Sequence, residues 1–179
     1  AVKFAEISVI RLAEKIRTAV VELNPEILLY HNGLLPELQR ETGTYLECEC
    51  LPTGGWGYEH LPVHASYLRN YGKPVLNMTG RFHESWGDFG GIRTSASLEY
   101  DCLYGVANGL RTTIGDHFHP RGDLNRAVMQ LDRDVYRRMG QLDPWLDGAH
   151  PITEAAVVML KPYPGYEHRA PQNAAQHQR

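Results

Sequence analysis

Apolar residues recur along this chain with two different periods, which predict alternating helices and strands. Helical spacing covers residues 4–23, 61–71, 95–109 and 124–139. Shorter apolar runs predict strands at 26–31, 44–50, 74–79, 111–117 and 153–160, and residues 34–43 are predicted to be a surface connection. The order α-β-β-α-β-α-β-α-β predicts a parallel sheet with helical crossovers, and therefore an α/β fold.

Polar and aromatic residues gather directly after several predicted strands, in 31–33, 47–58, 79–91 and 115–121. Enzymes with a (β/α)8 barrel build their sites from these carboxyl ends of strands. A doubly wound nucleotide-binding fold is disfavoured, because no Gly-x-Gly-x-x-Gly turn or Gly-Lys-Ser/Thr loop follows a strand. A whole barrel takes about 250 residues, so a chain of 179 residues with four βα units predicts half of one.

The predicted strand at 44–50 has one apolar and one polar face. The apolar face comprises Leu46, Cys48 and Cys50, and the polar face comprises Tyr45, Glu47 and Glu49. In a barrel the polar face would point inward, where two glutamates are costly unless they are paired or used. Glu49 is nearer the carboxyl end and is the better site candidate; the alternative is an edge strand whose two glutamates are solvated.

The loop GRFHESWGDFGG at 80–91 interleaves charged and aromatic residues, as carbohydrate sites do. Rings stack on the apolar face of a pyranose, whereas carboxylates and histidine bind its hydroxyls. A carboxyl group beside Trp86 or Phe82 would also have the raised pKa that a general acid needs. Trp56 and Tyr58 could form a second wall of this site. The alternative is a polar surface loop with structural aromatic residues.

Asp116, His117 and His119 form an Asp-His-x-His sequence at the end of the predicted strand at 111–117. Such a set can bind zinc. Hydrogen bonds to sugar hydroxyls, or within the cluster, are favoured here, so neither a metal nor another cofactor is predicted. His31, which precedes Asn32, fits either a substrate contact or a loop stabilised by an Asx turn.

The composition is that of a globular protein, with 42% hydrophobic and 22% charged residues. The 18 basic and 21 acidic residues are dispersed, which argues against nucleic-acid binding through a basic face. No apolar stretch approaches the length of a membrane span. Three cysteines cannot all pair, and they predict buried, reduced thiols in a cytoplasmic protein. The chain opens inside a predicted helix without an initiator methionine, which indicates a processed chain or a fragment.

Four long segments carry a resemblance to a known enzyme family: YLECECLPTGGWGYEHLP, GKPVLNMTGRFHESWGDFGG, GLRTTIGDHFHPRGDLN and LDPWLDGAHPITEAAVV. They resemble the C-terminal half of the barrel in the "hypothetical glycosyl hydrolase 6" group, which includes bacterial α-L-fucosidases of glycoside hydrolase family 151 and alpha-amylase-like proteins. The resemblance covers roughly residues 5–160. It implies that the strands at 26–31, 44–50, 74–79 and 111–117 are barrel strands five to eight.

The resemblance also implies a domain organisation. Residues 1–150 are expected to form the half-barrel, whereas the composition of residues 162–179, which are rich in Pro, Gln, His and Ala, predicts a disordered tail. Residues 151–161 are expected to begin a flavodoxin-like domain that is related to the trimerisation domain of family 42 β-galactosidases. The strand at 153–160 would be the first strand of that domain.

The implied activity is retaining hydrolysis of a terminal sugar, an α-L-fucoside first, by two carboxylates that such enzymes hold about 5–5.5 Å apart. Glu84 is the first candidate for a catalytic carboxylate and Glu49 the second. The other member of the pair commonly follows strand four, which lies in the missing half. The resemblance assigns substrate contacts to His31, Trp56, Tyr58, His83, Trp86, Asp116 and His117.

Two other functions stay open. One is a non-catalytic carbohydrate-binding or oligomerising half-barrel module, and the other is a metal-dependent hydrolase that uses Asp116, His117 and His119. A half-barrel exposes two sheet edges and an apolar face. The expected partners are therefore a carbohydrate substrate and either a second copy of the chain or the missing N-terminal half. No nucleic acid and no membrane is expected as a partner.

Overall fold

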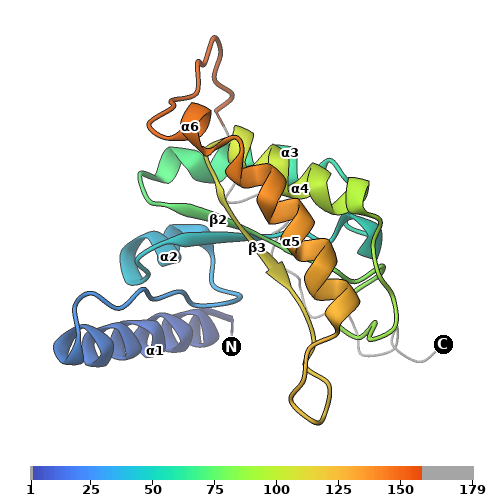
Figure 1. Cartoon of the computed structure of the whole chain (residues 1–179). Helices are drawn as coiled ribbons and strands as arrows, with labels where there is room; N and C mark the ends of the chain where they lie inside the picture. The colour runs from blue at the N-terminus through green and yellow to red at the C-terminus, as the bar shows by residue number, and fades with distance from the viewer. Residues whose placement is uncertain (1, 159–179) are drawn as a thin grey trace.

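A computed structural model describes residues 2–158 and places three parallel strands at the centre of the fold (Figure 1). They are β1 (Leu46–Glu49), β2 (Val75–Gly80) and β3 (Arg111–Gly115), and they lie in the order β1-β2-β3. Leu46 pairs with Val75, and Leu76 pairs with Arg111. The predicted α/β class is confirmed, as are the strands expected at 44–50, 74–79 and 111–117.

The helices that follow the strands pack on one face of this sheet (Figure 1). After β1 come the short 3-10 helix η1 (Pro52–Gly54), α3 (His60–Leu68) and η2 (Arg69–Tyr71), and α3 packs on β1. After β2 comes α4 (Ser95–Ala107), which contacts β2, β3 and α5 (Arg126–Gly140). Thr94 and Asn125 cap α4 and α5, because each side chain accepts a hydrogen bond from a backbone N–H of the first turn.

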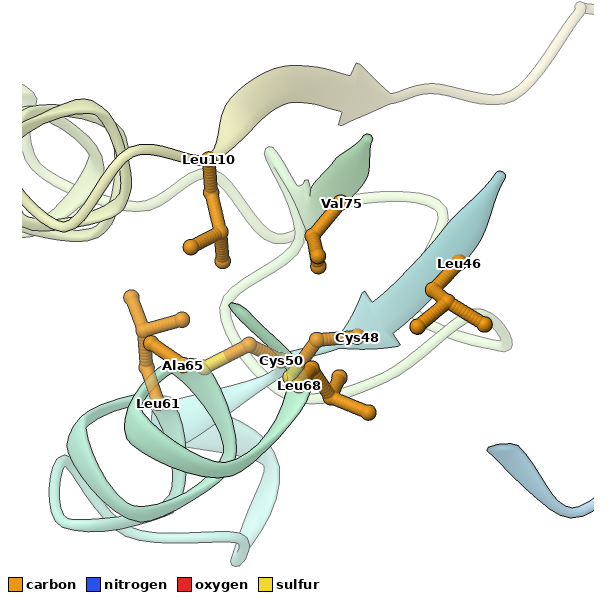
Figure 2. Packing of buried hydrophobic residues seen from close by; sticks show 8 residues of the cluster. All are labelled: Leu46, Cys48, Cys50, Leu61, Ala65, Leu68, Val75 and Leu110. Carbon is orange, nitrogen blue, oxygen red and sulfur yellow. The ribbon is translucent and has the colours of Figure 1, made fainter. Parts of the chain in front are cut away.

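The apolar core lies between the sheet and these helices. Its larger cluster joins β1 to α3 and is formed by Leu46, Cys48, Cys50, Leu61, Ala65, Leu68, Val75 and Leu110 (Figure 2). The predicted apolar face of β1 is therefore confirmed, and Glu47 and Glu49 on its other face are half-buried. All three cysteines are free and buried, and burial raises the pKa of Cys50 and of Cys102 to about 12.

The strand predicted at 26–31 is absent, because its backbone forms no continuous ladder. The carbonyl of Leu29 accepts a hydrogen bond from the backbone N–H of Thr44, but the N–H of Leu29 donates to the Thr44 hydroxyl instead of a carbonyl. Residues 34–43, predicted to be a surface connection, contain the helix α2 (Pro36–Thr42). Pro36 suits a first helical turn, where its missing N–H costs nothing.

The strand predicted at 153–160 is also absent over residues 151–158, and its last two residues lie outside the described part, as does the predicted tail. Ile152, Val157 and Val158 are 81–95% exposed, so no neighbouring element covers them. The short helix α6 (Asp143–Leu146), which the sequence pattern does not predict, precedes this segment.

The first helix, α1 (Val2–Leu23), confirms the helix predicted at 4–23 but buries little of its surface. It lies beside α2, apart from the sheet (Figure 1). Ala13 is buried, whereas Phe4 is 76% exposed and Leu12 is 58% exposed. No helix within residues 2–158 is both long and apolar enough to cross a membrane.

A buried ion pair joins the sheet to α4. Arg93 lies 2.7 Å from the carboxylate of Asp101, and both side chains are only 1% exposed. The Arg93 guanidinium also donates to the hydroxyl of Thr79 on β2, which in turn donates to Asp101. Burial raises the pKa of Asp101, and the charge of Arg93 opposes that rise.

Replacing Arg93 with methionine is expected to lower the free energy of unfolding by about 3–5 kcal/mol, because the buried Asp101 carboxylate would lose its cation. Urea denaturation followed by circular dichroism measures the change. The matched control is Arg138→Met, which breaks a partly exposed pair with Glu99 and should cost less than about 1 kcal/mol. Equal losses in the two variants would contradict the role assigned to the buried pair.

Candidate functional site

The carboxyl ends of the three strands meet at one edge of the sheet, and the candidate site lies there. Glu49 ends β1, the loop 81–94 follows β2, and residues 116–119 follow β3. The pairing of β2 with β3 continues past the strand ends, because the N–H of Arg81 donates to the carbonyl of Gly115. This pairing brings the two loops side by side.

Four rings form an aromatic cluster, namely Phe82, Trp86, Phe89 and His117. The His117 ring stacks on Phe89 with centroids 4.1 Å apart and lies 4.4 Å from the Phe82 ring. Trp86 packs against Phe82 at 4.7 Å and approaches His117 edge-on. Phe82 is buried, whereas Trp86 and Phe89 are 37% and 66% exposed, so the cluster presents ring surface to solvent.

Trp86 connects this cluster to β1. Its indole N–H donates to the Oε1 of Glu49 at 2.5 Å, a hydrogen bond that crosses from the loop after β2 to the end of β1. The ring also lies over Gly115 on β3, where an added Cβ would overlap it. The glycine thus makes room for the indole, and the indole places Glu49 beside the cluster.

The loop itself is held by Asp88 and Arg81. The Asp88 carboxylate accepts hydrogen bonds from the backbone N–H groups of Glu84 and Gly91, and these bonds hold the pKa of Asp88 below its usual range. The buried Arg81 pairs with Asp116 at 2.6 Å and donates to backbone carbonyls of the loop. Asp88, one of the acidic residues of the predicted sugar loop, is thereby engaged in shaping the loop.

The structure separates the predicted site residues into two groups. Glu49, Trp86 and His117 come together at the strand ends. Glu84 and His83 are exposed and line an open hollow of about 630 Å³ that the loop 83–92 forms alone. Within residues 2–158 the Glu84 carboxylate has neither a hydrogen bond nor an ion pair, and its backbone carbonyl packs against Gly54.

The other predicted contacts lie elsewhere in the described part of the chain. The Tyr58 hydroxyl bonds to Ser97 at 2.7 Å and its ring packs on Tyr100, so Tyr58 lies against α4. Trp56 packs edge-on against His60, at 5.0 Å. The His60 ring bonds to the backbone of Glu49, although burial and the neighbouring His64 lower the pKa of His60 to about 4.

His31 lies in the loop between α1 and α2. Its backbone N–H donates to the side chain of Gln39, which donates back to the His31 carbonyl. The ring Nε2 is buried and has no hydrogen-bond partner among the described residues. His31 therefore has an unused polar atom within residues 2–158, and its hydrogen bonds join it to Gln39 and not to the aromatic cluster.

The three residues of the possible zinc set do not converge. Asp116 is bonded to Arg81, and the Nδ1 of His119 accepts the backbone N–H of Arg121 in a surface turn. Over residues 2–158 no three acidic, histidine or cysteine side chains form a group that could hold a metal ion.

Two residues that sequence reasoning left out of the site matter to its chemistry. Arg81 stands in the quoted loop sequence, but only its contacts assign it a role. Asp132 comes from α5 and its pKa is raised by the charge of Asp116, and no pattern in the sequence links the two. Glu47, next to Glu49 on the same face, has its pKa raised by burial and by the charge of Glu49.

Three comparisons with known proteins gave one similar solved structure. No family model and no curated protein matches the chain. A solved structure, alpha-L-fucosidase isoenzyme 2 from Paenibacillus thiaminolyticus, matches with a TM-score of 0.71 and 35% sequence identity. The match covers 76% of this chain and 21% of that protein, so the chain corresponds to about a fifth of the fucosidase's length.

The buried carboxylate of Asp132 predicts a pH-dependent stability. Burial first, and the charge of Asp116 second, raise the pKa of Asp132 to about 6. Between about pH 4 and 6 the unfolded chain releases this proton before the folded chain does, so stability falls as the pH rises. Asp132→Asn should therefore gain stability relative to the parent by about 2–3 kcal/mol across this range.

Unfolding free energies measured from pH 4 to pH 7 check this prediction. Asp134→Asn is the matched control, because Asp134 is exposed on the same helix and bonds to Gln130 and Arg137. The difference in unfolding free energy between Asp134→Asn and the parent should stay nearly constant over the same pH range. A flat difference for Asp132→Asn as well would contradict the prediction.

Proposed function

We propose that this chain is the C-terminal part of a glycoside hydrolase barrel, to which it contributes the three strands β1, β2 and β3, and that this barrel removes a terminal sugar, with an α-L-fucoside as the preferred substrate. The observation that carries the proposal is the Trp86–Glu49 hydrogen bond within an aromatic cluster at the carboxyl ends of parallel strands. An indole face next to a carboxylate suits a pyranose, which has an apolar face and a rim of hydroxyls. The 35% identity to an α-L-fucosidase supports the choice of sugar.

Completion of the barrel is part of the proposal. The three strands leave both sheet edges unpaired within residues 2–158, and α1 exposes apolar side chains such as Phe4 and Leu12. Edges and apolar faces of this kind favour association. We infer that the missing N-terminal half-barrel, or a second copy of this chain, pairs with these edges.

The catalytic step in this proposal is retaining hydrolysis by two carboxylates. Glu49 is half-buried and oriented by Trp86, whereas Glu84 is exposed on the loop. Either can supply one carboxylate, and the completed barrel would supply the other. Trp86 and His117 would contact the sugar directly; His31, Trp56, Tyr58, His83 and Asp116 stay predicted contacts. No cofactor is needed for this chemistry.

Hydrolysis of aryl α-L-fucoside, β-galactoside, β-glucoside and α-L-arabinoside, with light scattering on the same sample, tests the proposal. Release of one aryl group by a defined oligomer is expected if copies of the chain complete the site. Sugar binding by a stable oligomer without any release would instead support the alternative, a non-catalytic carbohydrate-binding half-barrel. Neither release nor binding of any sugar would contradict both.

Glu49→Gln and Glu84→Gln distinguish the two carboxylates in whichever assembly proves active. Loss of an acid or base in the reacting pair should lower kcat about 10²- to 10⁴-fold. Glu99→Gln is the control, because Glu99 lies on α4 and pairs with Arg138. A loss of only a few-fold removes the substituted glutamate from the reacting pair.

A further inference from the structure

Arg81 is as heavily hydrogen-bonded as Arg93, although it has no place among the residues that would touch a sugar. It is 4% exposed, and its Nε donates to the Oδ1 of Asp116 at 2.6 Å. Its two terminal nitrogens donate to the carbonyls of Gly91 at 2.6 Å and Phe89 at 3.2 Å. The loop is thus wrapped around one guanidinium.

This arrangement makes the loop depend on Arg81. A buried guanidinium is tolerated only when its donors are satisfied, because loss of water is otherwise uncompensated. Three backbone carbonyls, those of Asp88, Phe89 and Gly91, serve that purpose here. The cation also lies 5.3 Å from the centroid of the Phe82 ring. Arg81 therefore contacts both the backbone of the loop and its buried aromatic side chain.

His117 is held by the same pair of charged residues. Its backbone N–H donates to the Oδ1 of Asp116 at 2.7 Å, and its ring Nδ1 lies 3.5 Å from a terminal nitrogen of Arg81. Arginine can only donate hydrogen bonds, so the Nδ1 of His117 must accept. In the neutral ring the proton is then on Nε2, which becomes the donor of the imidazole.

We propose that Arg81 is a positioning residue that, with Asp116, holds His117 as an Nε2–H donor beside the aromatic cluster. The inference rests on the proposed carbohydrate site and deepens it. The subsite then offers ring faces from Trp86 and Phe89, an acceptor in Glu49 and a donor in His117. Such a set recognises a pyranoside whose neighbouring hydroxyls can both donate and accept hydrogen bonds.

Arg93 provides a matched comparison within the same loop. It is also an arginine and is 3% exposed, but it bonds to Asp101, Thr79 and Ser97 on the side of α4. Its substitution should affect stability without acting on the His117 ring. The pair Arg81→Lys and Arg93→Lys therefore separates positioning from a general structural role.

The first test is the tautomer of His117 in the full chain, measured by ¹⁵N NMR of the histidine side chains and assigned with His117→Gln. The parent should show an unprotonated Nδ1 and a protonated Nε2. Arg81→Lys should shift the ring signals toward the other tautomer, because one ammonium nitrogen replaces the two guanidinium nitrogens that contact Asp116 and the Nδ1 of His117. Arg93→Lys should leave them unchanged. A protonated Nδ1 in the parent would overturn the proposal, as would unchanged His117 signals in folded Arg81→Lys.

If Arg81→Lys fails to fold, Asp116→Asn replaces it, because it removes the carboxylate charge while preserving the side-chain shape. The same change in tautomer is expected. Unaltered His117 signals in folded Asp116→Asn would count against the role assigned to the Arg81–Asp116 pair. The tautomer of His117 in the parent chain tests the proposal independently of either variant.

Titration calorimetry with methyl α-L-fucopyranoside connects the tautomer to binding. Arg81→Lys should bind about tenfold more weakly than the parent, a loss that corresponds to one hydrogen bond to a charged or oriented group. Arg93→Lys should bind as the parent does. Absence of binding by the parent would count against the proposed function, whereas the NMR result would still decide the positioning role.

Discussion

A buried guanidinium must satisfy its hydrogen-bond donors within the protein, and this constraint shapes the loop after β2. Arg81 and Arg93 stand at the two ends of that loop, both nearly inaccessible to water. Arg93 bonds to β2 and α4, whereas Arg81 bonds to Asp116 after β3 and to carbonyls inside the loop. The N–H of Arg93 also donates to the carbonyl of Arg81, which closes the loop at its base. The side chains of Arg81 and Arg93 thereby join α4, the sheet and the loop.

The site inherits its geometry from this framework. Because the loop is held at its base, Trp86 can lie across Gly115 and reach Glu49 on β1. His117 is placed by contacts to both Asp116 and Arg81, and the rings of Phe82 and Phe89 pack around it. A carboxylate, an imidazole and exposed ring faces therefore occupy one edge of the sheet. This combination of groups is the physical basis of the proposed carbohydrate ligand.

The same structure explains why a larger assembly belongs to the proposal. Helices α3, α4 and α5 bury one face of the sheet, while the side chains of Glu47, Leu76 and Thr113 on the other face are only half-buried. Two glutamates on such a face would be costly in a dry interior, and burial already raises the pKa of Glu47. In an assembly that covers this face, Glu47 and Glu49 would lose more of their contact with water. Association would therefore change the environment of both carboxylates.

Local pattern was sufficient to predict the helices 4–23, 95–109 and 124–139, three of the strands and the two faces of β1, because side-chain periodicity follows directly from backbone geometry. It also predicted a site in the loop 80–91, and the structure places this loop at the carboxyl end of β2. It failed at 26–31 and 153–158, where the apolar run has no neighbouring strand within residues 2–158, since a strand needs a partner for its hydrogen bonds. Only the tertiary structure decided that Glu49 meets Trp86, that Glu84 stays exposed, and that the charge of Asp116 acts on Asp132, because these interactions join segments far apart in sequence.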